Sequence, residues 1–488
     1  METKVMNDKH QAIDETYDTD ILVVGGGISG LAAAVEAGHQ EGVEVLLVES
    51  NAYCGGNGMG VEGMLGVDSV MQKEANIHLD PVELIGYEHQ QAQYTPNGSL
   101  WLDLIYNSAE NVQWCLDQGV EYDKVDDYHG TCVAPTFHWF KGGVASKGYV
   151  PQMKKKAEEL GVKFLLETPV TELIEENGKV VGVYSKTKNK NIQINAKAVI
   201  LATGGIGGDK ELVHRAGWKL ENTVLTGMPS VKGDGYKLAM SAGAMDTITN
   251  SCQLIVNYIQ ALPYEGVYPH YDQLNGMMGL PAGGPFLWVN QDGDRFVNEN
   301  IRQTNIMLQS LAINSNKVAY MIFNQEIYDD FTKDIENAKD VLEKAVKENK
   351  GNSLYKADTF EELAEKVGLP KEEFLRTVEH YNEMAANGRD IDFGKETDKL
   401  VPINNGPYYI ARLDFNYIVG IGGIGSNKWF EVIDDQYDPI PGLYVAGMDT
   451  AMQYHDVYTI NVGGSACAHN VNSGRTAVKR AKQYIDSL

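Results

Sequence analysis

A glycine-rich turn between two short apolar segments near the N-terminus constrains the fold more than any other feature of the sequence. Residues 20–24 are apolar and largely β-branched after the first, which is typical of a strand buried on both faces of a parallel sheet. Three glycines follow in the spacing GxGxxG: Gly25, Gly27 and Gly30. A helix of small residues is expected over 31–37, and a second strand over 43–48 ends at Glu49. This order predicts a dinucleotide-binding unit at the start of an α/β fold.

Each glycine of such a turn has its own task. The first makes the tight turn, the second lets a pyrophosphate approach the backbone, and the third lets helix and strand pack closely. The phosphates then lie at a helix N-terminus, where free N–H groups and the macrodipole favour negative charge. Glu49, 19 residues after Gly30, is placed to accept hydrogen bonds from the ribose of an adenosine and to repel a 2′-phosphate. A second match, over 420–425, precedes no convincing helix, and we interpret it as a chance match.

Charge and cysteine usage exclude several classes of partner. The net charge is 41 − 67 = −26, so nucleic acid and anionic membrane surfaces would repel the chain. The five cysteines lie far apart without a CxxC pair, which predicts neither a disulfide framework nor a metal site and indicates a reducing compartment. The N-terminus lacks the pattern of a secretory signal, and no apolar run approaches 18 residues. We therefore expect a cytoplasmic protein.

The composition changes twice along the chain. A β-hairpin is expected over 170–184 with Asn177-Gly178 in its turn, and a buried strand over 198–201. The middle is rich in tyrosine and carries charged helical stretches over 338–348 and 359–387, whereas the end returns to the style of the start and closes with a helix over 466–487. We predict an α/β fold in which a Rossmann-like nucleotide-binding domain (1–256 and 421–488) carries an inserted α+β capping, or clamp, domain (257–420).

Further motifs occur in a fixed order from end to end. They are Gly55-Gly-Asn57, residues 138–143, Ala202-Thr-Gly-Gly205, Gly233-Asp-Gly235, residues 290–299, residues 440–447 and Gly463-Gly464. In these stretches, and over 20–49, the sequence resembles the FAD-dependent fumarate reductase and succinate dehydrogenase flavoprotein superfamily. That superfamily also includes urocanate reductases, ketosteroid dehydrogenases and aspartate oxidases. The resemblance implies an FAD-dependent oxidoreductase acting on CH–CH bonds.

The resemblance also implies contacts to the cofactor. It places Glu49 on the adenosine ribose, the backbone near Val170 on the adenine, and Gly56 and Asn57 near the pyrophosphate. The amides at the start of the last helix, those of Ser465, Ala466 and Cys467, would meet the pyrimidine carbonyl of the flavin. The positive helix end would there stabilise the anionic reduced ring. The other residues assigned to the cofactor are Gly25, Gly27, Ser29, Gly30, Gly63, Ala202, Thr203, Gly204, Asp234 and Gly447.

Two departures from the family bear on how the flavin is held. The membrane complexes tether FAD to a histidine in the loop after the second strand, and no histidine lies between Glu49 and Gly66 here. Non-covalent FAD is therefore expected. The family's Ala-Gly-Glu, whose carboxylate meets the ribityl chain, is Ala446-Gly447-Met448, with Asp449 adjacent.

The substrate side departs further. Fumarate reductases of this family hold a dicarboxylate with two histidines and an arginine, and relay a proton through further charged groups. The three clamping positions are Leu262, Val419 and Asn461 here, and the relay positions fall on Gly279 and Ala282. A carboxylate needs charged donors to offset its desolvation, so a fumarate reductase is not expected. Arg302 stands one position short of the family's proton-donating arginine; it is either that arginine after a one-residue slip or a salt-bridged structural residue.

Tyrosines and histidines take the place of the missing charges. They are Tyr258, Tyr264, Tyr268, His270, Tyr271 and Tyr417 in the presumed cap, and Tyr454, His455 and Tyr458 before the last helix. Such side chains suit a larger apolar substrate with a carbonyl, although any single tyrosine fits simple packing as well. We assign the 454–458 cluster to the active site because the chain must pass the flavin there. The candidate catalytic residues are Arg302, Tyr417, Tyr454, His455 and Tyr458.

Three functions follow from these residues. The first is an ene-reductase, in which hydride from flavin N5 reaches the β-carbon of a steroid, bile-acid or aryl enone and Arg302, Tyr458 or His455 protonates the α-carbon. The second is a dehydrogenase running the reverse, ketosteroid-type reaction. The third is a flavin-bearing electron-transfer subunit without its own substrate. The electrons would come from NAD(P)H, a reduced flavin or an electron-donor protein, and the sequence does not choose among them.

Overall fold

The computed structural model describes residues 13–128, 132–219, 223–225, 227–262, 284–300, 306–334, 336–450, 452–455, 458–459 and 461–488, without the side chains of residues 224, 253–258, 306–309 and 416. Several residues named above therefore lie outside the described part: Tyr264, Tyr268, His270, Tyr271, Gly279, Ala282 and Arg302, together with the side chain of Tyr258.

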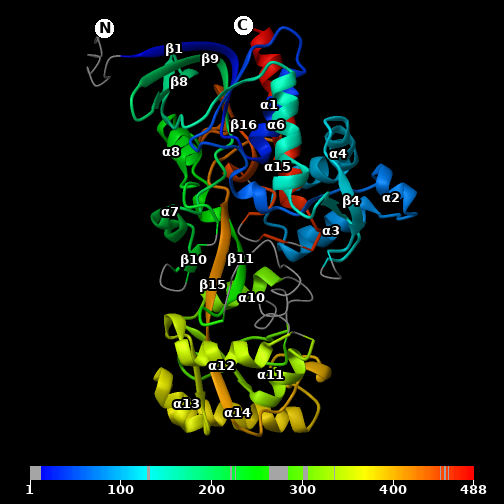
Figure 1. Cartoon of the computed structure of the whole chain (residues 1–488), viewed down its shortest axis with the longest axis vertical. Helices are drawn as coiled ribbons and strands as arrows, with labels where there is room; N and C mark the ends of the chain where they lie inside the picture. The colour runs from blue at the N-terminus through cyan, green and yellow to red at the C-terminus, as the bar shows by residue number, and fades with distance from the viewer. Residues whose placement is uncertain are drawn as a thin grey trace.

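An eight-stranded sheet organises the upper body of the molecule (Figure 1). Its strands are β1 (Glu15–Val24), β2 (Val45–Val48), β6 (Lys163–Leu165), β7 (Val170–Glu176), β8 (Lys179–Lys186), β9 (Asn191–Leu201), β16 (Glu431–Ile433) and β17 (Pro439–Val445). The parallel part has the order β17-β9-β1-β2-β6, and antiparallel β16 closes one edge. The last segment of the chain thus completes the sheet that the first segment begins, as the predicted domain insertion requires.

Helices cover this sheet and carry a small third sheet beside it (Figure 1). They are α1 (Ile28–Gly38), α2 (Val70–Glu74), α3 (Pro81–Gln91), α4 (Gly98–Asp117), α5 (Ala145–Gly148), α6 (Val150–Glu159), α7 (Lys210–Arg215), α8 (Asp234–Ser241) and α15 (Ser465–Asp486). The third sheet has the order β3 (Gly63–Leu65), β5 (Phe137–Phe140) and β4 (Tyr122–Asp126). Short 3-10 helices span Gly56–Gly60, Ile248–Asn250, Lys350–Asn352, Thr397–Lys399 and Gly447–Asp449.

Helix α15 is fastened to its neighbours by a close backbone contact and a buried charge. A Cβ on Gly474 would lie 2.5 Å from the carbonyl oxygen of Ser29, so only glycine lets α15 approach α1 this closely. The buried guanidinium of Arg475 donates to Glu36 of α1 at 3.0 Å and to Asn111 of α4 at 2.5 Å. These contacts fix where the N-terminal end of α15 points.

A second, six-stranded sheet lies below the first (Figure 1). Its strands are β10 (Thr223–Leu225), β11 (Cys252–Tyr258), β12 (Leu287–Asn290), β13 (Ala319–Asn324), β14 (Leu354–Ala357) and β15 (Tyr408–Ile421). The accompanying helices are α10 (Ile306–Asn314), α11 (Gln325–Phe331), α12 (Ala338–Glu348), α13 (Phe360–Val367) and α14 (Lys371–Ala386). The long strand β15 pairs with β10, β11, β13 and β14 and runs from the lower body up toward the first sheet. Strand β10 lies before residue 257, the predicted start of the inserted domain, and strand β11 crosses it. The domain boundaries of the sequence analysis stay a prediction.

The predicted α/β fold is confirmed, and the differences have local causes. Strand β1 begins before the apolar run because residues 15–19 pair with 192–196 of β9. The helical stretch expected over 359–387 is divided into two helices: Gly368, whose φ of 74° is left-handed, follows α13, and Pro370 precedes α14. The hairpin is confirmed, with Asn177 and Gly178 at φ of 50° and 74°. The second glycine match begins in the last two residues of β15, and the next element of the chain is the strand β16.

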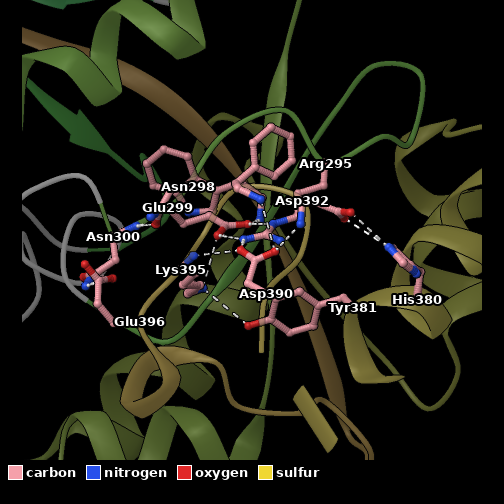
Figure 2. A network of polar contacts seen from close by, with 12 residues as sticks. Arg295, Asn298, Glu299, Asn300, His380, Tyr381, Asp390, Asp392, Lys395 and Glu396 are labelled. Atoms are coloured by element: carbon pink, nitrogen blue, oxygen red, sulfur yellow. Dashed lines mark hydrogen bonds and ion pairs between the residues drawn. The ribbon is translucent and has the colours of Figure 1, made fainter. Parts of the chain in front are cut away.

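The segment 290–299 supplies a buried ion cluster in the lower body (Figure 2). Arg295 donates to Glu299 at 2.8 and 2.9 Å and to Asp390 at 2.7 Å. The ammonium of Lys395 lies 3.2 Å from Glu299 and donates to the carbonyl of Phe286 at 2.6 Å. All four charged side chains are buried, and their charges sum to zero. The cluster therefore ties the loop before α10 to the loop after α14.

Breaking this cluster should destabilise the protein. Glu299→Gln would leave two buried cations facing Asp390 alone, and an uncompensated buried charge typically costs about 3–5 kcal/mol. The midpoint of urea unfolding, followed by far-UV circular dichroism, should fall clearly. The control is Glu373→Gln, which removes an exposed carboxylate beside Arg376 and should not shift the midpoint measurably. Equal midpoints for the two variants would show that the cluster contributes nothing.

Candidate active site

The carboxyl ends of four parallel strands meet at one edge of the first sheet. Val24 pairs with Val48 on one side and with Leu201 on the other, and Leu201 pairs with Val445, so the four strand ends are level. The loops that follow are 25–30, 49–55, 202–205 and 446–449. In open α/β sheets ligands bind in the crevice at this edge.

The three glycines of the first loop lie as their predicted tasks require. A Cβ on Gly25 would lie 2.2 Å from the carbonyl oxygen of Ala202, and one on Gly30 would lie 1.8 Å from that of Gly25. A Cβ on Gly27 would meet only the carbonyl of Gly55, at 3.9 Å, so the backbone there stays open. Gly27 is also the N-cap of α1, which has no side-chain cap and no acidic residue in its first turn. The free amides suit a pyrophosphate, and the residues present fit FAD.

Glu49 is nearly buried and braces the glycine turn. Its Oε2 accepts from the amide of Gly26 at 2.7 Å, and its Oε1 accepts from the backbone and side-chain nitrogens of Asn51 at 2.8 and 2.7 Å. The Ser50 hydroxyl also donates to Oε1 at 3.2 Å, whereas Oε2 accepts only the Gly26 amide among the described residues and has a second acceptor position for a ribose hydroxyl. The contact to Gly26, which the sequence did not reveal, joins the acidic residue to the phosphate turn.

Asp449 is the polar residue that sequence reasoning missed. Its carboxylate accepts hydrogen bonds from the Thr203 hydroxyl at 2.9 Å and from the amide of Gly205 at 2.8 Å, and also from the amide of Thr203. Burial raises the pKa of this carboxyl, while the hydrogen bonds oppose that shift. Asp449 thus clamps loop 202–205 to loop 446–449. A carboxylate that follows a strand end two residues after a glycine was the available signal.

The remaining predicted cofactor residues line the same edge or pack behind it. Asn57 accepts from the amide of Met228 at 2.6 Å, and Gly56 has open space at its Cβ position. Gly63 packs against the backbone of His138, where a Cβ would lie 2.2 Å from the carbonyl oxygen. Ser29 lies against Gly447. Val170 begins β7, Gly204 is left-handed, and Asp234 lies in the first turn of α8.

The N-terminal end of α15 is a second open helix start. Gly464 caps it with φ of 84°, and a Cβ there would lie 2.4 Å from the backbone of Met64 and Leu65, so only glycine fits. No side chain caps the helix and no acidic residue occupies its first turn, which leaves the amides of its first residues for an electronegative ligand atom. Cys467 is buried, and burial raises the pKa of its thiol, in agreement with a packing role.

Tyr454 and Tyr458 converge on this helix start. The Tyr454 hydroxyl donates to Ser465 Oγ at 2.9 Å, and Tyr458 also hydrogen-bonds to Ser465. The two rings pack edge to face with their centroids 4.9 Å apart, and the ring of Trp101 packs edge to face on Tyr454 with a centroid distance of 5.6 Å. Burial raises the pKa of both phenols well above the ordinary value, so both hydroxyls stay protonated.

The other catalytic candidates are placed differently. His455 is half-buried, and its φ of 56° is left-handed. Tyr417 donates its hydroxyl to the carbonyl of Gly207 at 2.8 Å, just beyond loop 202–205. Arg302 lies outside the described residues. The structure therefore brings Tyr454 and Tyr458 together and places Tyr417 at a neighbouring loop.

The positions of the family's dicarboxylate clamp are buried. Leu262, Val419 and Asn461 have exposed fractions of 5%, 7% and 3%. The side-chain nitrogen of Asn461 has no hydrogen-bond partner within the described structure, and neither has the hydroxyl of Ser251, which lies beside Gly422 and Gly423. Uncharged polar atoms thus stand near positions where the family has charged donors.

The described residues contain neither a candidate metal site nor a candidate membrane-spanning helix. No group of three or more His, Cys, Asp or Glu residues in the described ranges could hold a metal ion. Within the same ranges, no helix combines the length and the apolar character that a membrane span requires.

An open glycine turn, a braced acidic residue and a second open helix start define an FAD-binding oxidoreductase. Residues 20–464 match the family model described as FAD binding domain. The chain is 32% identical over 485 residues to vinyl phenol reductase of Lactiplantibacillus plantarum, covering 95% of this chain and 96% of the relative. It is 28% identical to urocanate reductase of Eggerthella lenta, covering 95% and 74% of the two chains.

Solved structures agree with this assignment. The open conformation of a flavocytochrome c3 fumarate reductase is 26% identical with a TM-score of 0.69, covering 97% of this chain and 79% of that one. A 3-ketosteroid-Δ4-(5α)-dehydrogenase from Rhodococcus jostii RHA1 shares the fold with a TM-score of 0.73 at 21% identity, covering 97% and 98%. The chain belongs to the FAD-dependent fumarate reductase and succinate dehydrogenase flavoprotein superfamily. It is an FAD-dependent oxidoreductase acting on CH–CH or C=C bonds.

The open backbone at Gly27 gives a direct test of cofactor binding. Gly27 has φ of −74°, which alanine adopts freely, so Gly27→Ala should fold normally. Its methyl group would occupy the space over the helix start that the pyrophosphate needs. We expect an unchanged circular dichroism spectrum and an FAD affinity lowered by about tenfold or more, measured by flavin fluorescence titration.

Two glycine variants are the controls for this test. Gly86→Ala, in open space on α3, should change neither property. Gly30→Ala should impair folding itself, because its methyl would collide with the carbonyl of Gly25. If Gly27→Ala and Gly86→Ala bound FAD equally well, the pyrophosphate would not lie over this turn.

Proposed function

We propose that the protein is an ene-reductase for a bulky, largely apolar substrate whose C=C bond is activated by a carbonyl or an aromatic ring, and that it holds non-covalent FAD. The observation that carries the proposal is the replacement of the dicarboxylate clamp by Leu262, Val419 and Asn461, all of them buried. A buried carboxylate without charged donors is costly, so a dianion such as fumarate fits this site poorly.

Similarity to a known relative favours a narrower class of substrate. The similarity to vinyl phenol reductase, which extends over nearly the whole of both chains, favours an aryl alkene or aryl enone. Steroid and bile-acid enones remain within the proposal because the same uncharged, aromatic surroundings suit them.

The residues of this chain supply the proton side of the reaction. FAD, when bound, supplies hydride from N5, and reducing a C=C bond requires one hydride and one proton on the two carbons. Tyr458, with its hydroxyl kept protonated by burial, is our candidate for the proton. His455 and Arg302 are the other candidate acids. The unpaired amide of Asn461 is an uncharged donor available to a substrate oxygen.

The reverse reaction uses the same groups. A dehydrogenase of the ketosteroid type would take the proton and the hydride away, and the direction depends on the electron partner. The candidate sources of electrons are NAD(P)H, a reduced flavin and an electron-donor protein. An electron-transfer subunit without its own substrate is the third candidate.

An anaerobic reoxidation panel separates these functions. The flavin of the holoprotein is first bleached, and the return of its visible absorbance is followed with 4-vinylphenol, an aryl enone, a steroid enone and fumarate. We expect at least one apolar acceptor to reoxidise the flavin about 100-fold faster than fumarate, because charge-assisted hydrogen bonds contribute about 1.5–3 kcal/mol each. Fumarate turnover equal to the best acceptor would overturn the substrate class, and no reoxidation by any organic acceptor would favour the electron-transfer reading.

The tyrosine pair should matter for turnover more than for flavin binding. Tyr458→Phe and His455→Ala should keep the flavin spectrum and its reduction by the electron donor. Loss of a donor aimed at the reacting group typically slows the chemical step by about 10² to 10³. Stopped-flow absorbance would measure reoxidation by the best acceptor of the panel.

Tyr328→Phe is the matched control for these variants. It removes a buried hydroxyl that donates to Ala338 in the lower body and should leave reoxidation unchanged. If Tyr458→Phe and His455→Ala reoxidise at the wild-type rate, the cluster is packing, and Arg302 or Tyr417 becomes the leading acid.

A further inference from the structure

Glu88 of α3 is a fully buried carboxyl outside the residues assigned so far. Its exposed fraction is 0%, and its Oε1 accepts from the amide of Val462 at 2.8 Å. It also hydrogen-bonds to the Thr459 side chain. Both partners belong to the segment 459–462, which leads directly into Gly463-Gly464 and the start of α15. Glu88 therefore holds the chain in place immediately before the helix start that the family resemblance assigns to the flavin.

The surroundings of Glu88 suit a neutral acid and not an anion. Its second oxygen, Oε2, has no hydrogen-bond partner within the described structure. None of the described ion pairs includes Glu88. His89, its neighbour in sequence, packs against Gly98, and its Nε2 has no hydrogen-bond partner among the described residues. An ionised oxygen buried without a donor is far more costly than a neutral carboxyl. Burial accordingly raises the pKa of Glu88 to about 7, partly opposed by its hydrogen bonds to Thr459 and Val462.

The titratable groups whose pKa the charge of Glu88 raises include the tyrosine pair. They are Tyr87 on the same helix, Cys132, Tyr454 and Tyr458. Burial is the main cause that raises the pKa of each of these groups, and the charge of Glu88 adds to it. All of them are donors when protonated. An ionised Glu88 would attract these hydroxyls, because hydrogen bonds to a carboxylate are stronger than those between neutral groups.

We propose that Glu88 is a positioning residue for the active site: in its neutral form it fastens segment 459–462 and leaves the hydroxyls of Tyr454 and Tyr458 on Ser465, and when ionised it draws them away. The proposal rests on the proposed function in one respect, namely that the tyrosine pair serves the protonation step. It adds a pH dependence that the tyrosines themselves do not supply near neutral pH.

The first test is the pH profile of single-turnover reoxidation by the best acceptor of the panel, measured on the holoprotein. The wild-type rate should fall roughly tenfold between pH 6 and pH 8, which is the change in protonated fraction of an acid with a pKa of about 7. Glu88→Gln keeps a carbonyl acceptor for Val462 and Thr459 and cannot ionise, so its rate should be flat over this range. The control Glu83→Gln, an exposed change on the same helix, should keep the wild-type profile. A flat wild-type profile, or an unchanged slope in Glu88→Gln, would overturn the proposal.

The second test does not depend on turnover. The folded pKa of Glu88 lies above the unfolded value, so its contribution to stability is complete below the unfolded pKa and is lost as pH rises through about 7. The unfolding temperature of the wild type should therefore fall, relative to Glu88→Gln, from about pH 4.5 to about pH 7 and change little at higher pH. If this difference appears but no organic acceptor reoxidises the flavin, the proposed function fails and the buried ionisation of Glu88 stands. If the two proteins have parallel unfolding profiles, the proposal is wrong whatever the acceptor.

Discussion

The close approach of backbone to backbone around Gly25 is the constraint on which the remaining structure depends. A side chain at Gly25 or Gly30 would collide with a carbonyl oxygen at 2.2 or 1.8 Å, and one at Gly474 would collide with Ser29 at 2.5 Å. These contacts bring β1, β9, α1 and α15 to distances that no larger residue allows. Because α15 is fixed in this way, its open N-terminal end lies ten residues before Gly474, about 15 Å beyond the contact with Ser29 at the start of α1. In FAD the pyrophosphate lies between the adenosine and the flavin, so a site that holds both the pyrophosphate and the flavin ring requires two such anchors at a set separation.

Four buried carboxyl groups fix loops of the protein, and their charges are balanced in different ways. Glu49 and Asp449 are surrounded by backbone donors, which supply in the protein the hydrogen bonds that water would otherwise give. Glu299 is balanced by two cations in the lower body. Glu88 has neither a cation nor a donor for its second oxygen. Burial raises the pKa of Glu88 to about 7, so its protonation changes near neutral pH.

The sequence predicted the local parts of this arrangement and missed the long-range ones. The strand, glycine turn, helix and acidic residue lie within about 30 positions, so their spacing alone encodes the unit. The break between α13 and α14 was also a local signal, Gly368 followed by Pro370, although a continuous charged pattern masked it. The sequence could not show what Asp449 and Glu88 contact, because their partners lie up to 246 and 374 positions away. Hydrophobic periodicity identifies which face of a helix is buried but not which distant amide meets a buried acid.

The substrate side illustrates how charge and burial together restrict chemistry. Moving a dianion into a site lined by Leu262 and Val419 removes its hydration without supplying charged donors, whereas an aromatic or polycyclic substrate loses little by the same transfer. For the proposed reaction a neutral proton donor avoids this desolvation cost, whereas a cationic acid such as Arg302 would need charged partners to offset it. Phenols with raised pKa values satisfy this condition, because burial keeps them protonated while their hydroxyls remain hydrogen-bond donors. In the proposed site, the apolar clamp and the tyrosine pair therefore share one physical property. The clamp disfavours a charged substrate, and the tyrosines are uncharged acids.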